Sequence, residues 1–65
     1  MRKTVYLQFT YSDNDNFITK YYYGYYDKIF DHLNTLIIEA LPHTTFTLST
    51  QPIMGVLMRE YVKIN

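Results

Sequence analysis

One stretch of the sequence, residues 26–41, carries a long and regular helical period. Its apolar side chains recur at the spacings that place them along one face of an α-helix. They are Tyr26, Ile29, Phe30, Leu33, Leu36, Ile37, Ala40 and Leu41. The opposite, polar face consists of Lys28, Asp31, His32, Thr35 and Glu39. Asp27 has the residue type of an N-cap, and Pro42 excludes helical geometry at the residue before it. We therefore predict one amphipathic helix from Tyr26 to Leu41, with Ile38 off the buried stripe.

The segments before this helix have the features of a β-hairpin. Residues 3–11 alternate strictly, with four apolar side chains on one face: Val5, Leu7, Phe9 and Tyr11. The other face carries Thr4, Tyr6, Gln8 and Thr10. Residues 12–16 are Ser, Asp and Asn, which favour turns. A second strand follows over residues 17–25, but tyrosines on both of its faces leave the inward side undecided. We expect Gly24 to form a bulge or bend at which the chain leaves the sheet.

The segments after the helix are shorter and less regular. Residues 45–50 alternate again and predict a third strand, with Phe46 and Leu48 facing inward. Residues 53–64 fit a strand or a helix: glycine and β-branched residues favour a strand, whereas Arg59, Glu60 and the methionines favour a helix. We predict a strand that begins near Val56.

These elements predict one α+β domain over residues 1–65, in the order strand, strand, helix, strand, strand. Two hairpins would share one antiparallel sheet, and the helix would cover one of its faces. A chain of 65 residues is too short for more than one domain, and its hydrophobic core is small. Because the chain has no cysteine, no disulfide can stabilise this core. The absence of cysteine fits a reducing compartment. No apolar run is as long as a membrane span, and the N-terminal residues do not resemble a signal peptide. We therefore expect a cytoplasmic protein that has no contact with a membrane.

No motif for catalysis, metal binding or a cofactor stands out in the sequence. His32 and His43 are the only histidines, too few without cysteine for a zinc site. The acidic turn resembles the start of a calcium loop, but Phe17 and Ile18 stand where that loop needs an oxygen ligand and a glycine. No candidate nucleophile has a recognisable general base, and two glycines are too few for a glycine-rich phosphate loop. We therefore expect a protein that is not an enzyme and carries no cofactor.

The functional hypotheses depend on the aromatic content of the chain. Eight tyrosines and four phenylalanines are too many to bury in 65 residues, so some rings should be exposed, as is typical of contact surfaces. Six basic residues balance six acidic ones, which argues against strong phosphate binding. Two interpretations of the tyrosines in residues 21–26 stay open. Half of the rings can cover the core while the rest form cross-strand pairs with Tyr6 and Thr10, or the rings can form an aromatic contact surface. On the second interpretation we predict a protein-binding surface on the uncovered sheet face. Its candidate residues are Tyr6, Lys20, Tyr21, Tyr22, Tyr23, Tyr25 and Arg59.

In size and composition the chain resembles the small proteins with which phages and mobile elements inhibit host enzymes, such as anti-CRISPR proteins. The abundance of Tyr, Asn, Ile and Lys is similar to that of proteins from AT-rich genomes. This resemblance covers no motif and assigns no residue. It implies a non-enzymatic inhibitor that acts in the host cytoplasm on a host protein such as a nuclease or an effector complex. The alternative is a single-stranded nucleic-acid binder, whose aromatic rings stack on bases while Lys20, Arg59 and Lys63 contact phosphates. A homodimer through the bare sheet face or an edge strand is compatible with the first hypothesis.

Overall fold

The computed structural model describes residues 2–40 and 44–65. Its elements are strands β1 (Thr4–Asp13) and β2 (Asn16–Tyr25), helix α1 (Tyr26–Ala40), strand β3 (Thr44–Ser49), the 3₁₀ turn η1 (Met58–Glu60) and strand β4 (Tyr61–Ile64). This order confirms the predicted α+β class with one helix and four strands. The predicted helix end at Leu41 and Pro42, and the loop histidine His43, lie outside the described residues.

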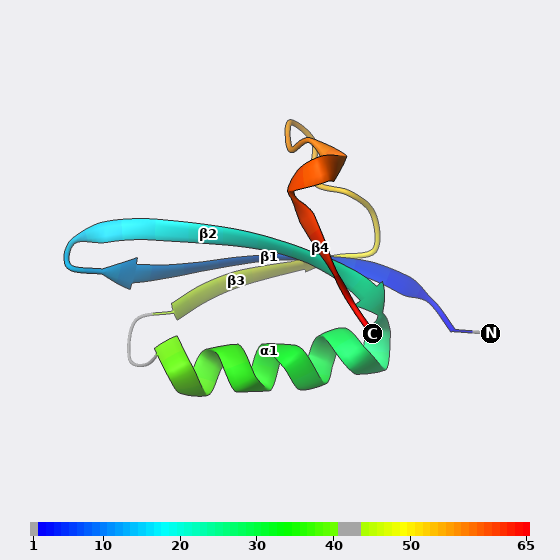
Figure 1. The fold of residues 1–65 in the computed structure, drawn as a ribbon, viewed down its shortest axis with the longest axis horizontal. Helices are drawn as coiled ribbons and strands as arrows, with labels where there is room; N and C mark the ends of the chain where they lie inside the picture. Colours follow the sequence, from blue (N-terminus) through cyan, green and yellow to red (C-terminus); the bar gives the residue numbers. More distant parts are fainter. Residues whose placement is uncertain (1, 41–43) are drawn as a thin grey trace.

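The four strands form one sheet in the order β3-β1-β2-β4, and α1 lies along one of its faces (Figure 1). β1 pairs antiparallel with both β2 and β3. β4, however, pairs parallel with β2, so the sheet is mixed and the predicted second hairpin is wrong. The reason is that β4 joins the far edge of the sheet instead of folding back on β3. The connection from β3 to β4 must therefore cross the sheet.

The first hairpin forms as the sequence indicates. Its connection has two residues, Asn14 and Asp15, and both have a positive φ, at 49° and 69°. Two central residues with positive φ make the turn that matches the twist of the flanking strands, and Asn and Asp tolerate this conformation best after glycine. The turn fixes the register, in which Leu7 lies opposite Tyr22 and Tyr6 opposite Tyr23.

The hydrophobic core lies between α1 and the sheet. It consists of Val5, Leu7, Phe9, Tyr22, Ile29 and Leu33, each almost completely buried. The alternation of β1 and the period of α1 thus identified the inward side of both elements. Tyr26 and Phe30, which were expected on the buried stripe, are about half exposed and stack on each other instead. Ile38 is exposed, as predicted.

Two details of α1 differ from the sequence prediction. Helix α1 begins at Tyr26, so Asp27 lies in its first turn and is not the N-cap. The backbone N–H of Tyr26 donates to the carbonyl of Lys3 at 2.9 Å, which satisfies the first helical amide without a side chain. His32 is not on the wet face: its ring lies edge-on to Tyr22, with 4.7 Å between centroids.

Gly24 is part of β2 and makes neither a bulge nor a bend. It pairs with Val5 of β1 and with Ile64 of β4. A Cβ atom at this position would collide with the carbonyl oxygen of Ile64. Glycine is therefore needed here because the backbone of β4 approaches so closely.

The C-terminal segment contains less strand than predicted. β4 begins at Tyr61, not near Val56, and residues 50–57 form turns and bends. Only the three residues of η1 are helical, and Glu60 Oε2 accepts a hydrogen bond from the N–H of Leu57 at 3.0 Å. Gly55 has a φ of 89°, which favours glycine. In Figure 1 this crossover, residues 50–60, rises on the side of the sheet opposite α1.

The molecule is a thin slab with principal extents of 40 × 25 × 15 Å. Its accessible surface is 4935 Å², compared with about 4,400 Å² expected for a folded monomer of this mass. The chain thus exposes more surface than its size requires. No helix within the described parts of the chain is long and apolar enough to cross a membrane.

Candidate functional site: a tyrosine-lined sheet face

The sheet face that points away from α1 carries five tyrosines. In the hairpin register Tyr6 lies opposite Tyr23, and residues directly opposite each other share a face. Tyr21 and Tyr25 share this face with Tyr23 because side chains alternate along β2. Tyr61 joins them from β4, where it pairs with Tyr21. We call this set, Tyr6, Tyr21, Tyr23, Tyr25 and Tyr61, the tyrosine face.

The rings of the tyrosine face contact one another. Tyr6 stacks on Tyr23 with 5.9 Å between centroids and 19° between planes. Tyr61 meets Tyr6 edge-on at 5.3 Å and Tyr21 at 5.5 Å. These distances lie in the favourable range for aromatic pairs. Four of the five rings are thus held by a neighbouring ring, so they lose less side-chain entropy when they bind a partner than isolated tyrosines would.

The crossover covers one part of this face. Tyr61 is buried to 7% exposure, and its hydroxyl accepts a hydrogen bond of 2.8 Å from the backbone N–H of Ile53. Tyr6, Tyr21 and Tyr23 keep intermediate exposure, and Tyr25 is exposed. The face is therefore less bare than the sequence suggested: Tyr61 anchors the crossover, and the other four rings remain accessible beside it.

Three of the seven predicted contact residues lie elsewhere. Tyr22 is buried and pairs with Leu7 on the helix side of the sheet, so it is not part of the uncovered face on which it was expected. Lys20 lies opposite Phe9 and thus on the helix side, where its amine is 5.8 Å from the centre of the Tyr11 ring. Arg59 is exposed in η1, which belongs to the crossover and not to a strand. The structure brings together the remaining four: Tyr6, Tyr21, Tyr23 and Tyr25.

Sequence reasoning missed Tyr61 as a member of this face, and it named Lys63 only as a phosphate contact of the alternative ligand. Lys63 pairs with Tyr23 across β2 and β4, so it lies on the same side of the sheet. The signal was present in the sequence, because a strand with Val62 and Ile64 facing inward turns Tyr61 and Lys63 outward. It was hidden because the same residues also fit a helix.

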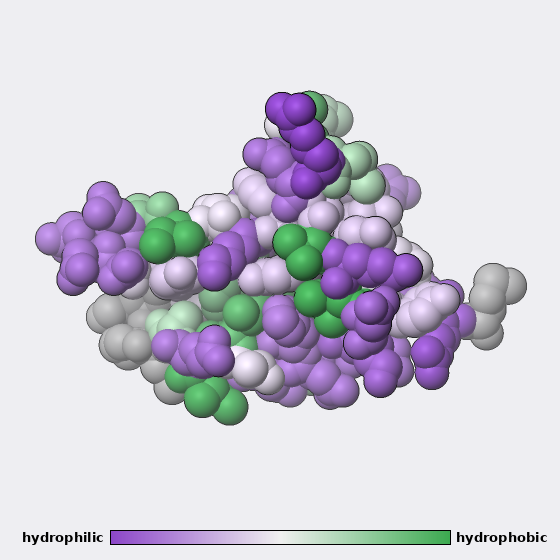
Figure 2. Space-filling view, in the orientation of Figure 1, coloured by the Kyte–Doolittle hydropathy of each residue, from purple (hydrophilic) through white to green (hydrophobic). Residues whose placement is uncertain are grey.

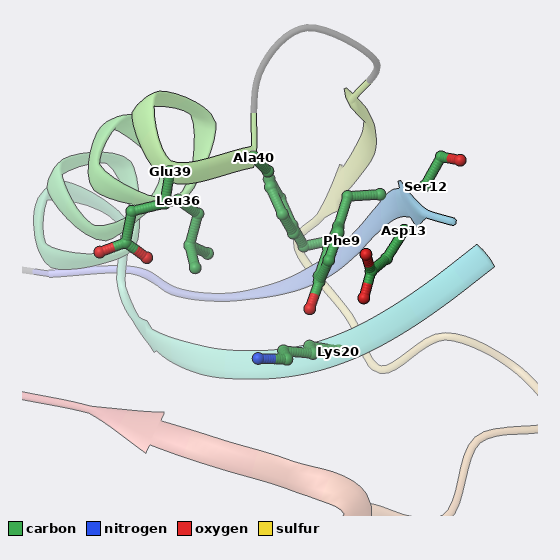
Figure 3. A pocket seen from close by; sticks show the side chains of 8 residues that line it. Phe9, Ser12, Asp13, Lys20, Leu36, Glu39 and Ala40 are labelled. Atoms are coloured by element: carbon green, nitrogen blue, oxygen red, sulfur yellow. The ribbon is translucent and has the colours of Figure 1, made fainter. Parts of the chain in front are cut away.

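A concave region lies on the helix side of the sheet, between the C-terminal half of α1 and the hairpin (Figure 3). Its volume is about 400 Å³, and Lys20 shares it with Asp13 and Glu39. Figure 3 shows Glu39 on the helix and Lys20 on β2, on different sides of the hollow. Among the residues that the structure describes, no group of three or more His, Cys, Asp or Glu side chains could hold a metal ion. The charged side chains of the hollow are thus one basic and two acidic ones, and the hydroxyl residues Tyr11 and Ser12 also line it.

Exposed apolar side chains also occur outside the tyrosine face. The crossover carries Met54, Leu57 and Met58, and Met54 is 97% exposed. Val62 on β4 is 55% exposed, and Figure 2 shows hydrophobic surface between the helix and the crossover, where β4 runs. The crossover thus adds exposed apolar side chains beside the tyrosine face, whereas Val62, which pairs with Tyr22, is exposed on the helix side of the sheet.

Comparison of the chain with known protein families, with curated proteins and with solved structures gave no match.

Proposed function

We propose that the protein is a small, non-enzymatic binding module that contacts another protein through its tyrosine face. The observation that supports this is the cluster of partly exposed, mutually packed rings at Tyr6, Tyr21 and Tyr23, with Tyr25 exposed beside them. Tyrosine is enriched among the residues that dominate binding energy at protein interfaces. A rigid aromatic ring supplies a large contact area at a low entropic cost.

The kind of partner follows from the resemblance in size and composition to small phage inhibitors. On this basis we propose a host defence protein or nucleic-acid-processing protein, bound stoichiometrically in the cytoplasm. The small hydrophobic core also supports binding to a partner, because a partner that binds only the folded state stabilises the folded protein by mass action.

Affinity capture from a lysate of the native host, with a matched pair of variants, tests the proposal. Tyr23→Ala with Tyr25→Ala removes two rings from the tyrosine face. Tyr26→Ala with Phe30→Ala removes two rings of similar exposure from α1. We expect the first variant to lose at least about tenfold in affinity for each ring, and the second to bind like the wild type. Equal binding by all three proteins would refute the tyrosine face as the interface.

A second copy of the chain is another occupant of the same surface. Sedimentation over a concentration series distinguishes it, because a homodimer dissociates on dilution whereas a monomer sediments alike at every concentration. If the Tyr23→Ala, Tyr25→Ala variant lowers the dimer fraction, the partner is a second copy and not a host protein.

Single-stranded nucleic acid ranks second as the ligand of this face. Aromatic rings on a sheet support it, but binding of this kind also needs cations along the strand. Of the three cations expected to contact phosphates, Lys20 lies on the other side of the sheet and Arg59 lies in the crossover, so that only Lys63 shares the sheet face with the rings. Fluorescence anisotropy with labelled oligonucleotides at two salt concentrations tests it: a salt-dependent isotherm that the Tyr23→Ala, Tyr25→Ala variant weakens favours nucleic acid.

A further inference from the structure

Half of the basic side chains of this neutral protein gather at one corner of the molecule. A pocket of about 440 Å³ lies where β2 leads into α1, and Arg2, Lys28 and Lys63 all line it. No acidic side chain is among its lining residues in the described ranges, although the chain has six acidic and six basic residues in all. Since like charges repel one another, three cations around one hollow favour an anion inside it.

The cations come from three separate elements, which the fold brings together. Lys28 lies in the first turn of α1, Lys63 lies in β4, and Arg2 precedes β1. The Arg2 guanidinium lies over the Tyr25 ring, 5.2 Å from its centroid, which holds this long side chain near the mouth of the pocket. The parallel pairing of β4 with β2 brings Lys63 to the pocket, so the hollow depends on the crossover topology.

The remaining walls determine what else the ligand must contain. They include the rings of Tyr23 and Tyr25 and the aliphatic side chain of Ile64. The volume lies within the usual range for small-molecule sites and exceeds what one oxyanion fills. Lys63 pairs with Tyr23 and Arg2 lies over Tyr25, so cations and aromatic rings line the same hollow, and together they match a phosphate joined to a planar base.

We infer that this corner pocket binds a nucleotide, with Arg2, Lys28 and Lys63 around the phosphate and the tyrosine rings beside the base. Arginine supplies paired donors that match phosphate oxygens, and the two lysines add point charges. The phosphate can belong to a free nucleotide or to the 5′ end of a strand. This site goes beyond the protein contact proposed above: it shares the rings of Tyr23 and Tyr25 with that contact and adds three cations to them.

The test is an NMR titration of the ¹⁵N-labelled protein with adenosine monophosphate, inorganic phosphate and adenosine. We expect the monophosphate to shift the amides of residues 23–28 and 62–65 in a saturable, salt-sensitive way. Inorganic phosphate should bind more weakly, and adenosine should cause no shift at the lysines. No saturable shift with the monophosphate, or equal affinity for the monophosphate and inorganic phosphate, would overturn the inference.

Variants locate the site and separate it from the protein contact. Arg2→Gln and Lys63→Gln should each weaken monophosphate binding by about tenfold, the loss typical of one charged hydrogen-bonding partner. Lys20→Gln is the matched control, because Lys20 lines the other hollow and should leave the affinity unchanged. Equal losses for all three variants would indicate unspecific charge attraction and overturn the site. Tyr21→Ala removes a ring that contacts Tyr61 and does not line this pocket, so it should weaken protein binding alone.

The source of the phosphate is distinguished with a short oligonucleotide, with or without a 5′-phosphate. Binding of the phosphorylated strand at the monophosphate affinity, and none of the unphosphorylated strand, supports a strand end as the ligand. Binding of the monophosphate alone supports a free nucleotide. Equal binding of both strands, without competition by the monophosphate, would overturn the pocket as the point of contact.

Discussion

Replacing Gly24 with alanine tests the packing of β4 against β2. Without a close neighbour, this substitution in a strand would stabilise the protein by about 0.4–1 kcal/mol, because alanine restricts the unfolded chain. Here the new methyl group would collide with the carbonyl oxygen of Ile64, a backbone atom that cannot rotate away as a side chain can. The sign of the change in unfolding free energy therefore decides whether β4 lies where the structure places it.

The magnitude follows from how β4 responds. If the strand shifts but stays paired, the cost is that of overpacking, about 1–3 kcal/mol. If the four pairs between residues 21–24 and 61–64 separate, the buried ring of Tyr61 is exposed as well. Burying an aromatic side chain of about 200 Å² is worth roughly 5 kcal/mol at about 25 cal/mol per Å², which sets an upper bound. We expect a destabilisation of about 2–3 kcal/mol, a large part of the stability of so small a domain.

Gly55→Ala is the matched control. No atom lies within 4 Å of a Cβ at Gly55, but its φ of 89° disfavours any L side chain. The cost there should be about 1 kcal/mol and should stay within the crossover. Urea unfolding followed by circular dichroism gives both free energies, and amide hydrogen exchange locates the change. We expect the amide hydrogens of residues 61–64 to exchange faster than in the wild type in Gly24→Ala, but not in Gly55→Ala. A stabilised Gly24→Ala protein, or one less affected than Gly55→Ala, would refute the reasoning.

Three further predictions concern single side chains. Tyr61→Phe removes the acceptor of the Ile53 N–H and should cost about 1–2 kcal/mol in urea unfolding; an unchanged midpoint would contradict that bond. His32→Leu removes an Nε2 atom that is buried without a hydrogen-bond partner among the described residues, so thermal unfolding should show equal or higher stability; a loss above about 1 kcal/mol would reveal a partner. Asp15→Gly places the preferred residue at a turn position with φ of 69° and should stabilise the hairpin by about 0.5 kcal/mol, measured by urea unfolding; destabilisation would argue against the two-residue turn.

The local parts of the fold could be predicted because their signals are local. The strict alternation of β1, the turn residues after it and the period of α1 each identify an element from neighbouring residues. The inward side of β2 could also have been found. A two-residue turn at Asn14 and Asp15 pairs Leu7 with Tyr22, and Leu7 faces the core. Unless the two turn residues are known, the register of the hairpin is not fixed, and tyrosines on both faces of β2 do not indicate which face is buried.

The place of β4 could not be predicted in this way, because a strand joins one edge of a sheet or the other through contacts distant in sequence. The alternation of Val62 and Ile64 indicates a strand but does not say whether it pairs with β2 or β3. The crossover, its contact with Tyr61 and the corner pocket all follow from that pairing. Sequence reasoning therefore found four rings of the tyrosine face but missed the fifth.

Residue-specific photocrosslinking tests most directly whether the tyrosine face binds a protein. Gln8 lies among the tyrosines, opposite Tyr21, and Thr35 is exposed on α1. With a photoreactive amino acid at position 8, we expect one crosslinked host protein, which the Tyr23→Ala, Tyr25→Ala background abolishes. With the same amino acid at position 35, we expect none. The same product from position 35, or no product from position 8, would contradict a protein interface on the open side of the sheet.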